Sequence, residues 1–302
     1  MKENVDILLA TFNGADYLAE MLGSLTQQVD VTINLIASDD GSTDGTLEIL
    51  ESFRQDFNSM QILNGPGTGP ANNFVSMLSR TTSPFIAFAD QDDLWAPNHL
   101  RNSIGRLRLG KSEVPSLTFS QVSHFGETVS TEVIWPSSIP KHFSGFFAQN
   151  FAQGCTIVFN RSMKETLESH VINDMIMHDW WALLIALGCG NVTFEPSVEV
   201  FYRIHSNNHI GAKRKSRFSF LKNQKPRIWA PLKQITEIRR VGTNSLSEEF
   251  LMSCDNFITG VSGQFLRRLR FALGYGHRLR QNKSDEIILR LGIVAYPLIF
   301  ET

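Results

Sequence analysis

The first ninety residues alternate between short apolar runs and stretches in which apolar side chains recur every three or four positions. The runs predict strands at 5–10, 31–37, 60–63 and 85–89. The stretches between them predict helices at about 17–25, 46–53 and 72–79. This alternation predicts a parallel sheet with helices on both faces. Farther along, the pattern predicts a helix at 98–109, a strand at 117–124 and a helix at 180–187.

The fourth apolar run ends in three carboxylates, Asp90, Asp92 and Asp93. In open α/β sheets the carboxyl ends of the strands are where ligands bind. Three carboxylates in four residues repel one another unless a cation or a proton offsets their charge. Mg²⁺ and Mn²⁺ prefer such oxygen ligands, usually completed by water and by a substrate's phosphates. The segment therefore indicates a divalent metal site, and a solvated acidic turn after a strand is the structural alternative.

The turns after the first two strands carry further polar groups. The first turn, 11–15, lacks the G-x-G-x-x-G glycines of a dinucleotide-binding dehydrogenase. The second strand ends in Asp39 and Asp40, which suit hydrogen bonds to a base N–H or a ribose hydroxyl. Helix capping and turn formation explain such acids equally well, and we prefer capping for Asp44.

Length and cysteine content set the outer bounds. The 302 residues allow one large α/β domain with appendages, or two domains. The three cysteines are widely spaced and odd in number, which predicts reduced thiols in a cytosolic protein and not a disulfide framework or a zinc site. No signal peptide is recognised at the amino terminus, and no apolar run reaches the roughly 18 to 20 residues of a membrane-spanning helix.

The net charge of −2 hides a strong asymmetry. Residues 1–212 sum to −12 and residues 213–302 to +10. The basic region could face an anionic membrane or nucleic acid, or dock on the acidic body. Nucleic acid is disfavoured, because no recognised nucleic-acid-binding pattern accompanies the charge. We expect Pro226 and Pro231 to interrupt any long helix there, whereas 265–273 mixes basic and apolar residues and suits a helix on an anionic membrane or one packed on the body.

Three segments in order, 11–13, 39–46 and 90–95, resemble the signatures of family 2 glycosyltransferases with the GT-A fold. The Asp-Gln-Asp-Asp form, with the later motifs, is most similar to bacterial rhamnosyltransferases that build O-antigen or capsular polysaccharide. The resemblance covers about residues 4–211. It implies a GT-A, Rossmann-like mixed sheet flanked by helices in a catalytic domain at 1–212. A basic, mainly helical region would follow at 213–302.

The resemblance assigns roles to matching positions. Asp39 would be the partner of the base N–H, Asp92 would hold Mg²⁺ or Mn²⁺ on the donor diphosphate, and Asp90 and Asp93 would lie at the donor diphosphate and sugar. A metal there would stabilise the charge that builds on a departing nucleoside diphosphate. The implied nucleotide pocket comprises Thr11, Phe12, Asn13, Asp39 and Asp40.

Two later motifs complete the resemblance on the acceptor side. Gly154 and Cys155 match an acceptor-side Gly-Cys-Thr strand, and Cys155 is disfavoured as a nucleophile because no base is paired with it in the pattern. Asp179 matches the general base that deprotonates the acceptor, although an acid in the first turn of a helix is also a good cap. His178 would orient that base, bind the acceptor or serve the core, and Trp180 would lie on the acceptor side.

The segment 200–211 resembles the family's Tyr-Arg-x-His-x-Asn-Asn motif after an edge strand. It assigns His205 to the metal or diphosphate, and Arg203 to a site carboxylate or to phosphate. A surface loop rich in turn formers is the alternative. For the aromatic residues between 143 and 151 we expect core packing before a sugar-stacking role.

The implied reaction is a single displacement that inverts the sugar's anomeric configuration. By family likeness the donor is dTDP-L-rhamnose, with a UDP-sugar left open by the residues themselves. The acceptor would be a saccharide or a polyprenyl-diphosphate-linked saccharide, and the enzyme would be cytoplasmic, with peripheral association at the inner face of the plasma membrane. Two alternatives stay open: a non-catalytic nucleotide-sugar or carbohydrate-binding protein, and a metal-dependent phosphoesterase.

Overall fold

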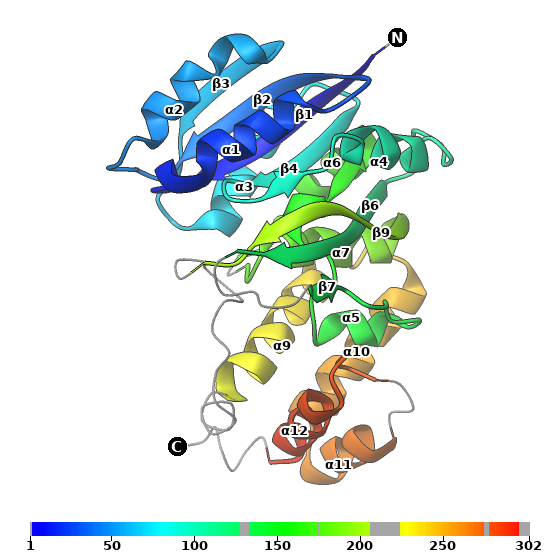
Figure 1. The fold of residues 1–302 in the computed structure, drawn as a ribbon. Helices are drawn as coiled ribbons and strands as arrows, with labels where there is room; N and C mark the ends of the chain where they lie inside the picture. The colour runs from blue at the N-terminus through cyan, green and yellow to red at the C-terminus, as the bar shows by residue number, and fades with distance from the viewer. Residues whose placement is uncertain (1, 127–132, 174, 206–223, 275–277, 296–302) are drawn as a thin grey trace.

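The computed structural model describes residues 2–126, 133–173, 175–205, 224–274 and 278–295. Its centre is a mixed sheet in the order β3-β2-β1-β4-β8-β6-β9-β5, with β7 paired to β6 (Figure 1). The first four strands in this order are parallel, and β8 is antiparallel to β4. The strands are β1 (Glu3–Thr11), β2 (Val31–Asp39), β3 (Ser59–Asn64), β4 (Phe85–Asp90), β5 (Leu94–Trp95), β6 (Ser116–Phe125), β7 (Val133–Trp135), β8 (Val158–Asn160) and β9 (Asn191–Arg203).

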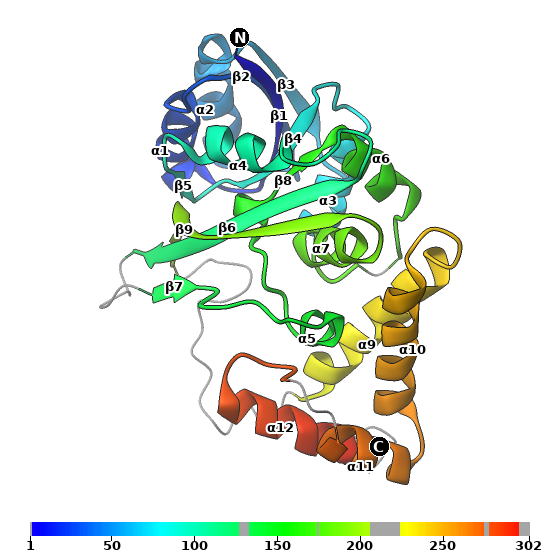
Figure 2. The same ribbon diagram turned by 90° about the vertical axis from the view of Figure 1, so that its right-hand side faces the viewer.

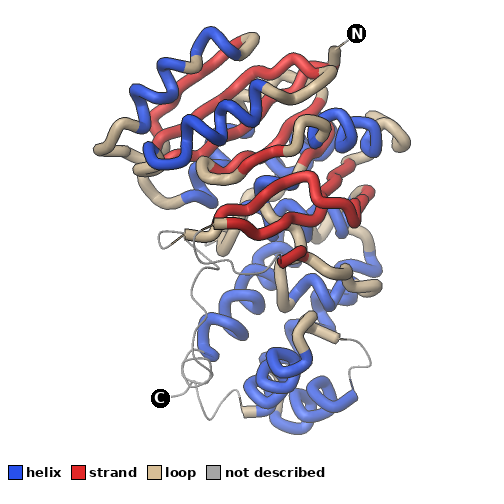
Figure 3. The backbone as a smooth tube through the Cα atoms, in the orientation of Figure 1, coloured by secondary structure: helices blue, strands red, loops and turns tan. Residues whose placement is uncertain are grey.

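Helices cover both faces of the sheet, with α1 and α2 on one side and α3, α6 and α7 on the other (Figures 2 and 3). Every strand and helix expected from the apolar pattern is present, within a few residues at each end. The helices of the body are α1 (Ala15–Thr26), α2 (Thr46–Ser52), α3 (Pro70–Leu78), α4 (His99–Leu107), α5 (Phe143–Phe147), α6 (Arg161–Ser169) and α7 (His178–Cys189), with short 3₁₀ turns η1 (Arg54–Asp56) and η2 (Gly154–Thr156).

The two faces follow from the period-2 alternation of the strands. On β1, Leu8 belongs to the apolar core beneath α3 and α7, whereas Ile7 and Leu9 belong to the core beneath α1. All three side chains are fully buried. A parallel strand covered on both faces has no polar side, which is why β1 and β4 read as continuous apolar runs.

The region after residue 223 is helical, as expected, and packs on the body through apolar contacts (Figure 1). Phe250 is fully buried and makes edge-to-face contacts with Phe143 and Phe147 of α5. The expected domain boundary at 212/213 lies outside the described residues. The helices are α9 (Gln224–Val241), α10 (Glu248–Ser262), α11 (Phe265–Gly274) and α12 (Lys283–Val294).

Three local expectations are corrected. Pro231 lies inside the 18-residue helix α9, because burial of neighbours such as Leu232 and Ile235 holds a helix that local propensity alone would break. Residues 154–156 form the turn η2 before strand β8 and are not themselves a strand. Strand β9 is not an edge, because it lies between β6 and the two-residue strand β5. Among the described helices, none is both long and apolar enough to cross a membrane.

Candidate active site

The carboxyl ends of three parallel strands bring the predicted polar residues to one edge of the sheet. Strand register pairs Thr11 with Asp39 and Ala10 with Asp90. The two acidic turns that are 51 positions apart in the sequence therefore flank the same strand, β1. This places the predicted nucleotide residues and the predicted metal residues beside one another, as an open α/β sheet would require.

Asp39 holds the second turn together. Its Oδ1 accepts the N–H groups of Gly41 (3.0 Å) and Ser42 (2.7 Å), and its Oδ2 accepts the hydroxyls of Thr11 (2.8 Å) and Ser42 (2.6 Å). The side chain is buried. Four protein donors thus occupy the carboxylate that the sequence assigned to the base N–H.

Asp40 is more accessible and less committed. Its Oδ1 accepts the Gly67 N–H at 3.1 Å, and the residue is partly exposed. Beside it, Phe12 exposes 56% of its surface. Asn13 lies in the left-handed region, with φ of 47°, and its Oδ1 accepts the Thr43 N–H. The loops after β1 and β2 are therefore tied to each other and leave Phe12 and Asp40 facing outward.

Gln91 connects these loops to the acidic turn. Its Oε1 accepts the Phe12 N–H at 2.9 Å, and its Nε2 donates to the Phe12 carbonyl at 3.1 Å. A Cβ at Gly14 would stand 2.3 Å from Gln91 Oε1, so this position requires glycine for the close approach. Sequence reasoning treated Gln91 only as part of a motif. The position of Gln91 between Asp90 and Asp92 was the sequence feature that could have indicated its role.

Within the acidic turn Asp93 is fully buried, whereas Asp90 and Asp92 are partly exposed. Oxygens of Asp90 and Asp93 lie within 4.8 Å of each other and of the Cys155 sulfur. Burial, together with the neighbouring carboxylates, raises the pKa of Asp90 to about 8 and the pKa of Asp93 well above its usual range. Asp93 accepts the Arg203 main-chain N–H at Oδ1, while its buried Oδ2 receives no N–H or O–H hydrogen bond from the described residues.

Asp92 turns away from this pair toward the predicted third motif. Its Oδ2 lies 2.7 Å from His205 Nε2, and the His205 ring packs on Tyr17 with centroids 4.6 Å apart. The Arg203 guanidinium binds the Glu20 carboxylate (2.6 Å) and the Asp92 main-chain carbonyl (2.8 Å). The third motif is thus folded onto the acidic turn and is not a surface loop up to residue 205; residues 206–211 lie outside the described part.

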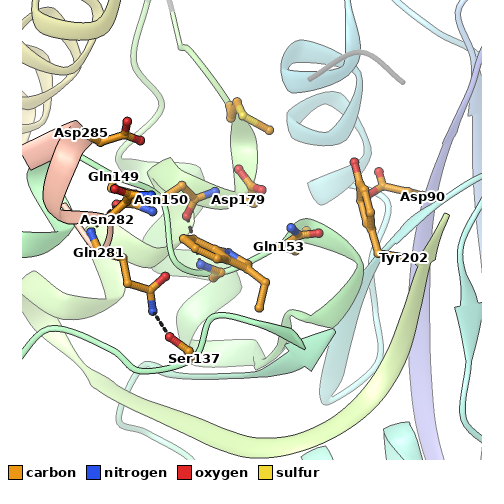
Figure 4. A pocket seen from close by; sticks show the side chains of 14 residues that line it. Asp90, Ser137, Gln149, Asn150, Gln153, Asp179, Tyr202, Gln281, Asn282 and Asp285 are labelled. Carbon is orange, nitrogen blue, oxygen red and sulfur yellow. Dashed lines mark hydrogen bonds between the residues drawn. The ribbon is translucent and has the colours of Figure 1, made fainter. Parts of the chain in front are cut away.

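Asp179 lies at the start of α7 and lines a pocket of about 780 Å³. It is almost fully buried, and burial raises its pKa to about 7, against hydrogen bonds from Trp180, Asn150 and Gly154 that lower it. Asp90 lines the same pocket. Figure 4 shows Asp179 between Asp90 on one side and a group of polar side chains on the other. A carboxyl with this pKa, facing a pocket, is suited to proton transfer near neutral pH.

Two predicted acceptor-side residues lie instead in the core. The His178 ring stacks on Phe74 with centroids 3.8 Å apart, and burial lowers its pKa to about 3, so it stays neutral. Trp180 is buried and donates its indole N–H to the Phe146 carbonyl at 2.7 Å. Neither residue lines the pocket. Gly154 does, and a Cβ there would stand 2.9 Å from His178 Nε2.

The aromatic residues near α5 are core residues, as expected. Phe146, Phe147 and Phe151 are each at most 4% exposed. Cys155 is buried, burial raises its thiol pKa well above the usual range, and it therefore stays a neutral thiol. The three cysteines are free, which confirms the expectation of reduced thiols.

Sequence reasoning missed most of the polar pocket wall. The wall is drawn from four separate segments, and its C-terminal part comes from the start of α12. The Gln281 N–H donates to Gln149 Oε1 across 132 positions of sequence. No local pattern marks such a contact. The missed lining residues include Trp135, Ser137, Gln149, Asn150, Gln153, Tyr202, Gln281, Asn282 and Asp285.

The residues present fit a divalent cation. Asp90, Asp92 and Asp93 supply oxygen donors, which Mg²⁺ and Mn²⁺ prefer. Burial, with the neighbouring carboxylates, raises the pKa of Asp90 and Asp93, an effect that a bound cation would oppose, and the buried Asp93 Oδ2 accepts no N–H or O–H from the described residues. Cys155, as a neutral thiol, adds no ligand suited to these ions.

The sequence and the fold both have known relatives. The model of the family "Glycosyl transferase family 2" matches residues 6–168. The dTDP-rhamnosyl transferase RfbG of Shigella flexneri is 27% identical over 95% of this chain and 99% of its own. The Escherichia coli UDP-Glc:α-D-GlcNAc-diphosphoundecaprenol β-1,3-glucosyltransferase WfaP is 26% identical over 68% of this chain and 79% of its own.

The fold is shared with a mannosyltransferase of Pyrobaculum calidifontis, PcManGT, whose solved structure contains GDP-Man and Mn²⁺. That structure superposes with a TM-score of 0.58, at 15% sequence identity, and covers 99% of this chain and 87% of its own. At this identity the likeness concerns the fold alone. It confirms the expected mixed sheet flanked by helices.

Proposed function

Because the chain belongs to glycosyl transferase family 2, we propose that it is an inverting glycosyltransferase that moves L-rhamnose from dTDP-L-rhamnose to a saccharide acceptor in the synthesis of a bacterial surface polysaccharide. One observation carries the proposal. The buried carboxyl of Asp179, with a pKa near 7, shares a pocket with Asp90 of the acidic turn. A base for an acceptor hydroxyl and an acidic edge for the donor thus border one space.

The donor site that we propose is the edge formed by the turns after β1, β2 and β4. The four hydrogen bonds at Asp39 favour Asp40 as the partner of the base N–H, with Phe12 beside it. Thr11 and Asn13 then act by fixing the two loops. The dTDP-rhamnosyl transferase relative supports dTDP-L-rhamnose as donor over a UDP-sugar.

Divalent metal dependence belongs to the same proposal. Asp92 would hold Mg²⁺ or Mn²⁺, with His205 beside it, while Asp90 and Asp93, whose charges act on one another and on Asp92, would add oxygen ligands or shape the turn. When bound, the ion supplies positive charge to the departing nucleoside diphosphate. The chain's own part is to present oxygen ligands at the carboxyl edge and to keep Arg203 engaged with Glu20 and the turn backbone.

The acceptor occupies the pocket of about 780 Å³. Gln149 offers its Nε2 donor and Gln281 its Oε1 acceptor to sugar hydroxyls, because Gln149 Oε1 and Gln281 Nε2 are engaged within the wall, while Trp135 offers an apolar face. Asp179 takes the proton of the attacking hydroxyl, and the oxygen attacks the anomeric carbon opposite the leaving group.

We also propose that the enzyme acts in the cytoplasm, at the inner face of the plasma membrane, on a lipid-linked acceptor. The name of the WfaP relative gives a diphosphoundecaprenol-linked acceptor for that protein. Helix α11 supports this. It exposes Leu266 (66%) and Leu273 (77%) together with Arg267 and Arg270, a combination suited to an anionic lipid surface.

Flotation with anionic liposomes tests the membrane contact. A chain ending before residue 213 would expose apolar core, so point substitutions are the cleaner test. Leu266→Asp with Leu273→Asp should remain in the dense fraction while the wild type floats. Equal flotation of both would exclude α11 as the contact.

Thermal stabilisation by ligands tests the donor site first. A ligand in excess of its dissociation constant raises the melting temperature by mass action. We expect dTDP and dTDP-L-rhamnose to stabilise the protein in the presence of Mn²⁺ and not in EDTA, and we expect Asp92→Ala to remove the effect. A lack of response to every nucleotide would refute the donor assignment. Transfer of the sugar to an acceptor, as opposed to nucleotide release without a glycosylated product, separates a transferase from a phosphoesterase.

A further inference from the structure

A second cavity of about 460 Å³ lies between the loop 137–142 and the segment 278–281. Its charged lining consists of Lys141, Arg278 and Arg280, with His142 beside them. No carboxylate is among the residues that line it in the described part of the chain. Cations gathered around one concave space repel one another, and a bound anion relieves that repulsion.

This cavity adjoins the acceptor pocket, because Ser137 and Gln281 line both. Gln281 fixes the junction: its Nε2 donates to Ser137 Oγ and to the Ser138 carbonyl, each at 2.9 Å. The Ser137 contact is drawn in Figure 4. The backbone approaches closely here, since a Cβ at Gly145 would stand 2.5 Å from Pro140 Cβ. The two spaces therefore keep a fixed relation to each other.

The buried acid nearest in sequence, Glu286, binds the main chain of the 278–281 segment. Glu286 is buried, and its Oε2 accepts the main-chain N–H groups of Leu279 and Arg280. Its Oε1 accepts from the Arg290 guanidinium at 2.6 Å. Asp285 lines the acceptor pocket and not this cavity. Glu286 thus shapes the 278–281 segment from behind and leaves the cavity face cationic.

We propose that this cavity binds the diphosphate of the acceptor, while the sugar attached to that diphosphate lies in the pocket beside Asp179. The inference rests on the proposed glycosyltransferase function and names the chemical class of its acceptor. The order of groups across the protein matches that of a diphosphate-linked sugar: the donor edge, the base, the amide-lined pocket and then the cations. Lys141 and Arg278 supply charge-assisted hydrogen bonds to phosphate oxygens.

Binding of geranyl diphosphate to the full-length protein tests the site without turnover. The titration is run in EDTA, where the metal-free donor edge repels an anion. We expect Lys141→Gln with Arg278→Gln to weaken binding at least about tenfold, since charge-assisted hydrogen bonds are lost. The matched control is Lys111→Gln with Arg80→Gln, which removes one exposed lysine and one exposed arginine elsewhere and should bind like the wild type.

Two further probes identify which part of geranyl diphosphate the cavity binds. Inorganic pyrophosphate should compete with geranyl diphosphate in the wild type and bind weakly to the double variant. Geraniol, which lacks phosphate, should not bind measurably. Binding of geraniol as tight as that of its diphosphate, or equal geranyl diphosphate binding by the double variant and the wild type, would overturn the proposal.

Turnover separates this proposal from the one on which it rests. With a diphosphate-linked acceptor the double variant should show a KM raised at least about tenfold, while the KM for the donor and for a neutral alkyl glycoside stay unchanged. Equal KM values for both acceptors in both proteins would remove the anion subsite and leave the transferase standing. If no acceptor reacts, yet diphosphate binding still needs Lys141 and Arg278, the transferase proposal fails and the anion site remains.

Discussion

Replacing Asp179 by asparagine removes the proposed base while keeping its shape. The side chain is only 3% exposed, and burial raises its pKa to about 7 in spite of the hydrogen bonds that it accepts. At pH 6 about one enzyme molecule in ten then carries the base in its ionised form, and at pH 8 about nine in ten do. The activity of the wild type should therefore rise about tenfold per pH unit below 7 and level off above it.

The same pKa shift predicts a change of stability with pH. Asp179 has an ordinary value of 3.8 in the unfolded chain and about 7 in the folded protein, so between these values the folded state binds one more proton. Stability is then greatest at low pH and falls as pH rises from about 4 to about 7. The full change is of the order of 4 kcal/mol.

Asp179→Asn does not ionise and should escape this loss. At pH 8 it should melt a few degrees above the wild type. Weaker hydrogen bonds from the N–H groups of Trp180 and Gly154 to the amide would reduce this gain in melting temperature. At pH 5 the advantage should shrink to less than half, and below about pH 4 it should disappear. A variant that is more stable and yet nearly inactive is the expected signature of a buried catalytic acid.

The assay measures kcat/KM for the acceptor between pH 5.5 and 9, together with melting temperatures at the two ends. We expect Asp179→Asn to lose about 10²–10⁴-fold in turnover and to lose the ascending pH limb. The control is Asp285→Asn in the same pocket, which should raise the acceptor KM and keep the limb. A turnover of Asp179→Asn within about threefold of the wild type, with the limb intact, would refute the assignment.

Three further substitutions test the supporting geometry. Gly154→Ala should lower kcat at least about tenfold, because its Cβ would stand 2.9 Å from His178 Nε2 and shift the start of α7, at a cost in unfolding free energy of about 1–3 kcal/mol; unchanged turnover would contradict this. Asp39→Asn should lower the melting temperature by several degrees, since an amide nitrogen replaces the acceptor of two of the four hydrogen bonds. Asp40→Asn, in contrast, should weaken nucleotide binding about tenfold by calorimetry and leave the melting temperature nearly unchanged. The reverse pattern would return the base contact to Asp39.

Burial on both faces made the strands predictable from sequence. Val5, Ile7 and Leu8 are all fully buried although they point to opposite faces, so the run is apolar throughout and cannot be mistaken for a solvated segment. Once the strands are placed, their parallel order brings the terminal acids to one edge of the sheet. Asp39 and Asp90 therefore lie on either side of the end of β1. The donor edge could therefore be predicted from local pattern and topology.

Which of two neighbouring residues faces the site, and which is enclosed by the protein, could not be predicted in this way. Asp39 and Asp40 are chemically identical, and only the turn geometry shows that one is enclosed by four donors while the other faces outward. His178 and Asp179 are adjacent in a helix, yet one stacks on Phe74 and the other lines the pocket. Adjacent helical residues point about 100° apart, so the side that meets the core is decided by tertiary packing.

The acceptor pocket includes residues of the C-terminal extension, whose positive charge suggested electrostatic docking on the acidic body. The opposite net charges of 1–212 and 213–302 allowed an electrostatic contact between body and extension. In the structure the contact is made by buried aromatic residues, with Phe250 set against α5. The ion pairs of Arg239 and Arg290 are formed instead with Asp255 and Glu286 of the extension itself. Apolar packing fixes the extension on the body, so an anionic acceptor, and not docking of the extension, would account for the cations that line the second cavity.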